Sequence, residues 1–366
     1  MNSLIKSSML ALMLALAGVA NANIVVGQSA PLSGNNAALG QDIRRGALAW
    51  FNTVNAKGGV NGNKIELITL DDKNQAALSG QNAKTLLEDH RVIALFGFAS
   101  ATLAAPALPL LEQSGTVLFA PFTGADSIHK QDQRVFTVRA SYRDETERIL
   151  TLWNGIYNKF AVVHYDDAVG NQNYEAVVSI LKSAGLSPLS VPVKRNEPVG
   201  HDVVPTILAA NPQLILFTTN ADPIVAIVRK IKAANGFFTM ASLSFAGSNF
   251  LKDALGSDGA GMAVSTVVPP YRSVALPIVH EYQAAMKRDG NDNLSYTSLE
   301  AYIAARALTE GLKRAGAHPT RKTLMNGLEN TGRMDLGGYV VNFMSGSHHG
   351  SRYVDVALIG SNGKFK

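Results

Sequence analysis

The sequence predicts an α/β protein of two lobes, each built on a parallel sheet with helices on both faces. Short apolar runs alternate with helical patterns over most of the chain, which is typical of βαβ units. The chain has 366 residues, which is long enough for two domains with a core each. It contains no cysteine, so packing alone has to stabilise both cores.

The amino terminus has the layout of a secretory signal. Lys6 precedes an unbroken apolar run over residues 9–19, and the small triplet Ala20-Asn21-Ala22 follows it. A helix needs roughly 20 apolar residues to span a bilayer, so a membrane anchor is the less favoured alternative. We expect cleavage after Ala22 and a soluble mature protein in the periplasm.

The strand candidates are apolar runs bounded by turn residues. They cover residues 24–27, 65–70, 92–96, 117–120, 160–164 and 214–218. Helical patterns cover residues 40–55, 76–89, 101–114, 144–157, 171–184 and 222–235. A longer helix is expected over residues 297–315, because Gly316 and Pro319 follow it as helix termini prefer. Two last strands are expected over residues 338–343 and 353–359.

Loops after the strands carry the candidate ligand contacts, because ligands of open α/β sheets bind beyond the carboxyl ends of the strands. Small residues and hydroxyls follow the first, third and fourth strands, at residues 30–34, 97–102 and 121–125. Ser100 and Thr102 stand near the start of a predicted helix, where backbone N–H groups and the helix dipole favour a carboxylate. N-capping is an equal alternative for either hydroxyl.

Several blocks of sequence together resemble the periplasmic leucine/isoleucine/valine-binding proteins, the type I solute-binding components of ABC transporters. The most specific block is Asn-Ala-Lys-Gly-Gly-Val-Asn-Gly at residues 55–62. Pro-Leu-Ser-Gly at 31–34, Asp-Asp at 71–72 and Ala-Pro at 120–121 add to it, and so does the late helix with Tyr-Ile-Ala-Ala at 302–305. The resemblance spans nearly the whole mature chain.

The resemblance implies a type I periplasmic-binding-protein fold: two Rossmann-like lobes joined by a three-strand hinge, with ligand in the cleft. Lobe I is expected to hold residues 23–142 and 271–346, and lobe II residues 143–270 and 347–366. Pro269-Pro270 fits the second crossing, because proline restricts itself and its predecessor to extended conformations. A plain loop is the alternative.

The resemblance also implies where the ligand binds. The predicted ligand contacts are Leu39, Ser100, Ala101, Thr102, Phe122, Thr123, Gly124, Tyr142, Asp144, Val169, Asn220, Ser244 and Phe245. The family's acidic partner of a ligand ammonium should fall near Ser244, and no acid is present there. This absence argues against an ordinary branched-chain amino acid, because a buried unpaired ammonium is costly. Asp144 is one substitute for the missing acid, although a helix-capping role is an equal alternative.

The predicted function is capture of an amino-acid-like, carboxylate or amide ligand by hinge closure and its delivery to an inner-membrane ABC permease. A sensor that signals to a membrane receptor is the alternative. An α/β enzyme is less favoured, since the chain has no G-x-G-x-x-G after a strand, no Walker loop, no G-x-S-x-G and no H-E-x-x-H. Asp71-Asp72 and Asp166-Asp167 are interpreted as caps, and His348-His349 as a solvated loop.

Charge and composition limit the classes of partner that this protein can have. The formal net charge is +5, and no run of five or more basic residues occurs. Nucleic acid is therefore not expected as a partner. No cofactor or metal is expected, and we expect a monomer.

Overall fold

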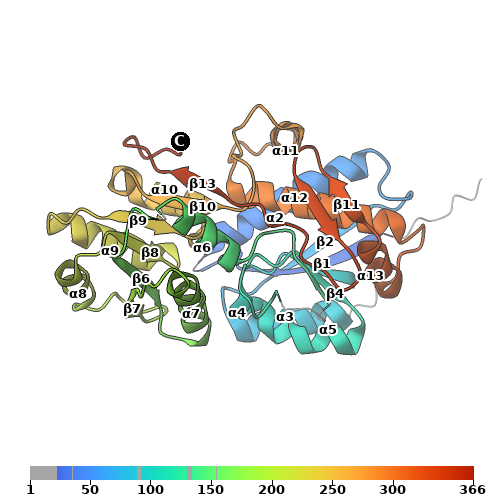
Figure 1. Ribbon diagram of the computed structural model, residues 1–366. Coiled ribbons are helices and arrows are strands. Elements are labelled where there is room, and N and C mark those ends of the chain that lie inside the picture. Colours follow the sequence, from blue (N-terminus) through green and yellow to red (C-terminus); the bar gives the residue numbers. More distant parts are fainter. Residues whose placement is uncertain (1–22, 35, 89–91, 130–133, 154) are drawn as a thin grey trace, which may run out of the picture.

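The computed structural model describes residues 23–34, 36–88, 92–129, 134–153 and 155–366, and it places them in two lobes side by side (Figure 1). The predicted signal, residues 1–22, lies outside this range, so its cleavage after Ala22 remains a prediction. No helix within the described ranges has both the length and the hydropathy that crossing a membrane requires.

Lobe I is built on a parallel sheet with the strand order β2-β1-β3-β4-β5. Its strands are β1 (Ile24–Ala30), β2 (Ile65–Asp71), β3 (Val92–Phe96), β4 (Val117–Phe119) and β5 (Val135–Phe136). Alternate side chains of these strands point to opposite faces, because successive residues of a strand do so. Both faces of the sheet are therefore apolar, and helices cover each of them (Figure 1).

The helices of lobe I divide between the two faces. One face packs against α2 (Ala37–Ala56), α11 (Pro277–Arg288), α12 (Tyr296–Arg314) and α13 (Arg321–Glu329). The other packs against α3 (Ala76–Glu88), α4 (Ala101–Ala104), the short turn η1 (Ala105–Ala107) and α5 (Leu108–Ser114). A hairpin of β11 (Gly332–Asp335) and β12 (Val340–Phe343) follows α13.

Lobe II has a second sheet, ordered β13-β10-β9-β8-β6-β7. Its strands are β6 (Phe160–Tyr165), β7 (Leu189–Val193), β8 (Leu214–Phe217), β9 (Thr239–Ser242), β10 (Ala263–Thr266) and β13 (Asp355–Leu358), and β13 runs antiparallel to β10. One face packs against α6 (Tyr142–Thr151) and α7 (Ala168–Lys182). The other packs against α8 (Val203–Ala210), α9 (Ala221–Ala233), α10 (Ser248–Leu255) and the turns η2 (Ser244–Ala246) and η3 (Gly256–Gly259).

The chain passes between the lobes three times, from β5 to α6, from β10 to α11 and from β12 to β13. The buried phenol of Tyr339 ties these connections together. Its hydroxyl lies 2.8 Å from the carbonyl oxygen of Val138 in the first and 3.0 Å from that of Val267 in the second. A hydrogen bond from Ser351 in the third also reaches it. The predicted lobe boundaries fall in or beside these connections, and the exact dividing residues remain a prediction.

The predicted fold class is confirmed, and the predicted strands agree with the structure to within a few residues. Two predicted helices differ. The helix expected over residues 101–114 is divided at η1, because Pro106 and Pro109 lack the N–H groups that a continuous helix needs. The helix expected over residues 144–157 begins at Tyr142 and ends at Thr151, before Gly155 adopts a φ of 75°. Pro269-Pro270 lies in the second connection, as expected.

Candidate functional site

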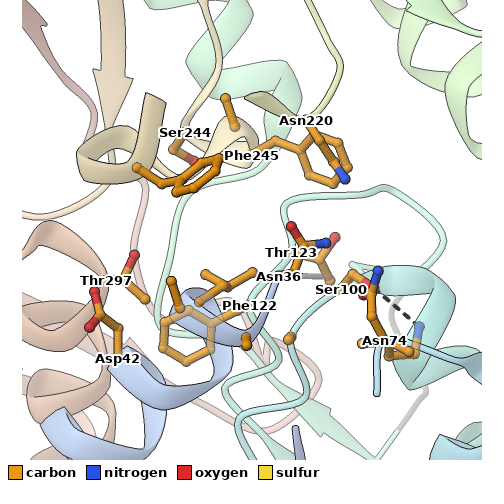
Figure 2. Close-up of a pocket in the computed structure, with 18 of the residues that line it drawn as sticks. Asn36, Asp42, Asn74, Ser100, Phe122, Thr123, Asn220, Ser244, Phe245 and Thr297 are labelled. Atoms are coloured by element: carbon orange, nitrogen blue, oxygen red, sulfur yellow. Dashed lines mark hydrogen bonds between the residues drawn. The ribbon is translucent and has the colours of Figure 1, made fainter. Parts of the chain in front are cut away.

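A cavity of about 830 Å³ lies between the two lobes. Much of its wall comes from segments that follow the carboxyl ends of parallel strands in both sheets, where open α/β sheets bind ligands. The start of α12 in lobe I adds Ser295, Thr297 and Glu300. The volume is within the range of small-molecule pockets. Figure 2 shows Phe122 from lobe I and Phe245 from lobe II on opposite walls of this cavity.

The lobe I wall consists of the cavity residues that lobe I supplies, and several of its polar groups are free. The Ser100 hydroxyl accepts a hydrogen bond from the Leu103 N–H at 3.2 Å, so Ser100 is the N-cap of α4 and its own hydroxyl hydrogen remains available. Thr102 is exposed to the cavity, and its hydroxyl has no hydrogen-bond partner among the described residues. This wall can therefore donate hydrogen bonds to a ligand oxygen.

The lobe II wall is the part of the cavity that lobe II supplies, and it combines one free amide with apolar side chains. Asn220 is the N-cap residue of α9, but its side chain makes no capping bond, so the carboxamide can face the ligand. Val169 lies near the start of α7. The Phe245 ring packs edge-on against Tyr142, with centroids 5.6 Å apart.

A buried network centred on Arg139, in the first connection between the lobes, adjoins the cavity through Arg139, Ser244 and Glu300. The guanidinium contacts Glu145 of α6 at 3.2 Å and Glu300 of α12 at 3.5 Å, and it also donates to the Ser244 hydroxyl. Glu145 is completely buried and accepts further bonds from Ser244 and Ser265. One cation thus joins helices of both lobes directly at the cavity.

Burial and charge act in opposite directions within this network. Burial raises the pKa of Glu300 to about 7, although the charge of Arg139 opposes the shift. Burial also disfavours the charged form of Arg139, but Glu300 and Glu145 outweigh it and hold the Arg139 pKa above its ordinary value. Arg139 therefore stays charged, and Glu300 takes up a proton near neutral pH.

Most of the predicted ligand contacts line the cavity. They are Leu39, Ser100, Ala101, Thr102, Phe122, Thr123, Tyr142, Val169, Asn220, Ser244 and Phe245. Whether these residues touch a ligand remains a prediction.

Gly124 and Asp144 do not line the cavity. A side chain at Gly124 would place its Cβ 2.6 Å from the backbone nitrogen of Tyr142, so this position needs glycine for close packing. Asp144 forms a capping box with Ser141 at the start of α6 and an ion pair with Arg352. Partial burial would raise its pKa, but hydrogen bonds from Ser141 and Arg352 outweigh burial and lower it. Its placement fits the capping alternative.

The sequence interpretation missed the Arg139 network and further cavity residues, among them Asp42 and Arg195. Arg139 did carry a signal, because it is a lone cation in the apolar run Val-Phe-Thr-Val-Arg-Ala at residues 135–140. Arg195 pairs with Asp167 at 2.7 Å and lies 3.8 Å from the centroid of the Tyr165 ring. Asp42 accepts from Ser295 at 2.6 Å and pairs with Arg45.

The remaining acidic and histidine pairs have structural partners. Asp71 accepts hydrogen bonds from the backbone of Leu32 and Lys73, and Asp167 caps α7 through the Gly170 N–H. His348 pairs with Glu329, while His349 stacks on His129 with ring centroids 4.8 Å apart. His348-His349 is therefore not the solvated loop that was expected. No group of three or more potential metal ligands occurs among the described residues.

Comparison with known proteins identifies relatives over nearly the whole chain. A Leu/Ile/Val-binding protein homolog 7 from Brucella suis biovar 1 is 26% identical over 329 residues, which cover 83% of this chain and 80% of that protein. A possible leucine/isoleucine/valine-binding protein from Rhodopirellula baltica is 27% identical, with a TM-score of 0.89 over 95% of this chain and 96% of that one.

A substrate-binding periplasmic protein from Ralstonia solanacearum is 29% identical, with a TM-score of 0.85 over 94% of this chain and 99% of that one. The model of a family described as periplasmic binding protein matches residues 23–364. The match covers almost all of the described residues, including both cavity walls and all three connections. The chain therefore belongs to the periplasmic binding protein family.

Proposed function

We propose that this protein captures a small organic molecule between its lobes in the periplasm and delivers it, as a monomer, to an inner-membrane ABC permease. The observation that carries the proposal is the cavity of about 830 Å³ whose walls come from both lobes. A ligand that contacts both walls binds the closed arrangement better than the open one, and this difference in affinity drives closure. The Leu/Ile/Val-binding relatives support an amino-acid-like, amide or carboxylate ligand.

The three connections support a hinge mechanism. Each is a short segment between elements of the two lobes, and Tyr339 ties all three at one point. Hinges of this kind concentrate the change of backbone angles in a few residues, while each lobe moves as a rigid body. The function proposed here needs no chemical step, so we expect every bound compound to be recovered unchanged.

A thermal-shift screen of the refolded, ligand-stripped protein tests capture. The panel contains amino acids, amides, aromatic acids and short carboxylates. Ligand at a hundredfold excess over its dissociation constant stabilises the native state by about 2.7 kcal/mol, which gives a clear rise in Tm. We expect one chemical class to give this rise. Absence of a shift with every compound, or turnover of the bound compound, would contradict the proposal.

Uptake of the same radiolabelled compound by cells tests delivery. Cells that lack this protein should lose uptake, and the wild-type gene should restore it. The variant Phe245→Ala should fold, because this ring is only partly buried, but it should restore uptake poorly, since the apolar wall of lobe II is removed. Full uptake without the protein would show that its role is not transport.

A further inference from the structure

The polar groups of Ser244 are used inside the protein and are not available to a ligand. The Ser244 N–H donates to Glu145 Oε2 at 2.8 Å, and its hydroxyl donates to Glu145 Oε1 at 2.9 Å. The same hydroxyl accepts a hydrogen bond from Arg139. In the turn η2, the side chain that faces the cavity is therefore that of Phe245.

Glu145 cannot accept a hydrogen bond from a ligand either. Its carboxylate is completely buried and accepts from the Ser244 N–H, the Ser244 hydroxyl, the Ser265 hydroxyl and Arg139. A carboxylate has about four acceptor positions, so these donors occupy its capacity. The acid nearest to the wall at Ser244 is thus fully engaged.

The carboxylates that line the cavity in the described part of the chain are almost all paired. Asp42 accepts from Ser295 and Arg45, Glu300 faces Arg139 at 3.5 Å, and Asp253 pairs with Lys252. The exception is Asp222, which has no hydrogen-bond or ion-pair partner among the described residues. Asp222 lies exposed in the first turn of α9, where water and the helix dipole satisfy a negative charge.

A cationic group of a ligand would be unfavourable beside Phe245. It would lose water there, and the acceptor positions of the nearest carboxylate, Glu145, are already occupied. The Arg139 guanidinium carbon lies 5.9 Å from the centroid of the Tyr142 ring, so a second positive charge there would be repelled. The lobe I wall, in contrast, offers the hydroxyl hydrogen of Ser100 and the free hydroxyl of Thr102 to a ligand oxygen.

We infer that the ligand is an organic molecule with an apolar body and a carboxylate or amide oxygen, and that it carries no α-ammonium group. The inference rests on the proposed binding function and names its substrate class. In this arrangement the oxygen binds the lobe I wall at Ser100 and Thr102. The apolar body lies between Phe122 and Phe245.

Matched pairs of compounds that differ only in the ammonium group test the inference. Isothermal titration of the ligand-stripped wild-type protein compares leucine with 4-methylpentanoate and leucinamide with 4-methylpentanamide. The aromatic pairs are phenylalanine with 3-phenylpropanoate and phenylalaninamide with 3-phenylpropanamide. We expect the compounds without the ammonium to bind at least roughly tenfold more tightly, because a desolvated unpaired charge is costly. The acid and amide arms show which oxygen is preferred. An amino acid that binds as tightly as its deaminated partner, or more tightly, overturns the inference.

The variant Asp222→Asn provides a second measurement on the same pairs. We expect it to leave the preference for deaminated compounds unchanged. If the wild type binds an amino acid better and Asp222→Asn loses that binding, Asp222 is the ammonium partner and the inference is wrong. If no member of any pair binds but a sugar, polyamine or peptide does, the inference fails while the binding function stands. Absence of binding in both panels overturns both.

Discussion

The two walls of the cavity use their polar groups in opposite ways. On the lobe I wall, the hydroxyl hydrogen of Ser100 and the hydroxyl of Thr102 are free. On the lobe II wall, every donor of Ser244 is bound to Glu145, and Glu145 is tied to Arg139. The hydroxyl groups of the two walls therefore differ: Ser100 and Thr102 can still donate hydrogen bonds into the cavity, whereas Ser244 belongs to the network that joins the lobes.

The largest expected effect comes from breaking the buried network centred on Arg139. Arg139→Met leaves Glu145 buried without its cation and Glu300 without its partner. Removal of one member of a buried ion pair costs about 3–5 kcal/mol. We expect a loss of this size in the free energy of unfolding, measured by urea titration.

Arg352→Met is the matched control for this experiment. Arg352 also pairs with a carboxylate, that of Asp144, but its side chain is 80% exposed. Exposed pairs contribute about 0–1 kcal/mol. Equal losses for the two variants would contradict the importance of the buried network.

A second prediction compares one hydroxyl from each wall. Ser244→Ala removes a donor to Glu145 and an acceptor for Arg139, and we expect about 1–3 kcal/mol of lost stability. Thr102→Val removes a free hydroxyl, so we expect a change in stability within about 0.5 kcal/mol and weaker binding of the ligand from the screen. Chemical unfolding and titration calorimetry measure the two effects. The comparison fails if Thr102→Val is the more destabilising change.

A third prediction concerns Tyr339, whose hydroxyl joins the connections between the lobes. Tyr339→Phe removes the one hydroxyl hydrogen that lies between the carbonyl oxygens of Val138 and Val267, and we expect about 1–2 kcal/mol of lost stability. We also expect a broader distribution of distances between the lobes. The chain has no cysteine, so spin labels attach only to the introduced Lys84→Cys in α3 and Lys182→Cys in α7, both at exposed positions. The distance between the two labels reports the separation of the lobes.

Tyr353→Phe serves as the control for the hinge. The Tyr353 hydroxyl lies 3.5 Å from Asp355 and is not shared between connections. Its loss should leave the distance distribution unchanged. A distribution in Tyr339→Phe that matches wild type would show that this phenol does not restrain the lobes.

The last prediction is a pH dependence that acts through the lobe I wall. His129 lies 3.3 Å from the carbonyl oxygen of Thr123 and stacks on His349. Burial, with repulsion from His349, lowers the pKa of His129 to about 4 from 6.5. Below pH 6.5 the unfolded chain therefore binds a proton that the folded chain does not, so stability falls as pH decreases toward 4.

Thermal unfolding between pH 7 and 4.5 measures this dependence. Arg139 also opposes protonation of His129, whereas Asp144 favours it. We expect the Tm of His129→Gln to fall less steeply with decreasing pH than the Tm of the wild type. Parallel curves for the two proteins would assign the pH dependence to other groups.

Much of the fold could be predicted from the sequence, because strand and helix periods are local properties. The strands over residues 92–96 and 160–164 were predicted nearly as observed, since each is a continuous apolar run. Short elements such as β5, with two residues, carry too little pattern to be recognised. The division of the helix after Ala104 was missed although Pro106 was visible, because a proline predicts a break without fixing its geometry.

The family resemblance supplied the cavity between the lobes and the predicted contact at Asn220. The sequence by itself predicted two α/β lobes with candidate ligand contacts in the strand-end loops, including those of Ser100 and Phe122. It could do so because periodicity and loop chemistry depend on neighbouring residues. Only the tertiary structure decided which polar groups are free. Arg139 meets Ser244 across 105 positions of sequence, and Glu145 meets it across 99. A hydrogen bond depends on the final positions of both partners, and no local pattern specifies partners so far apart.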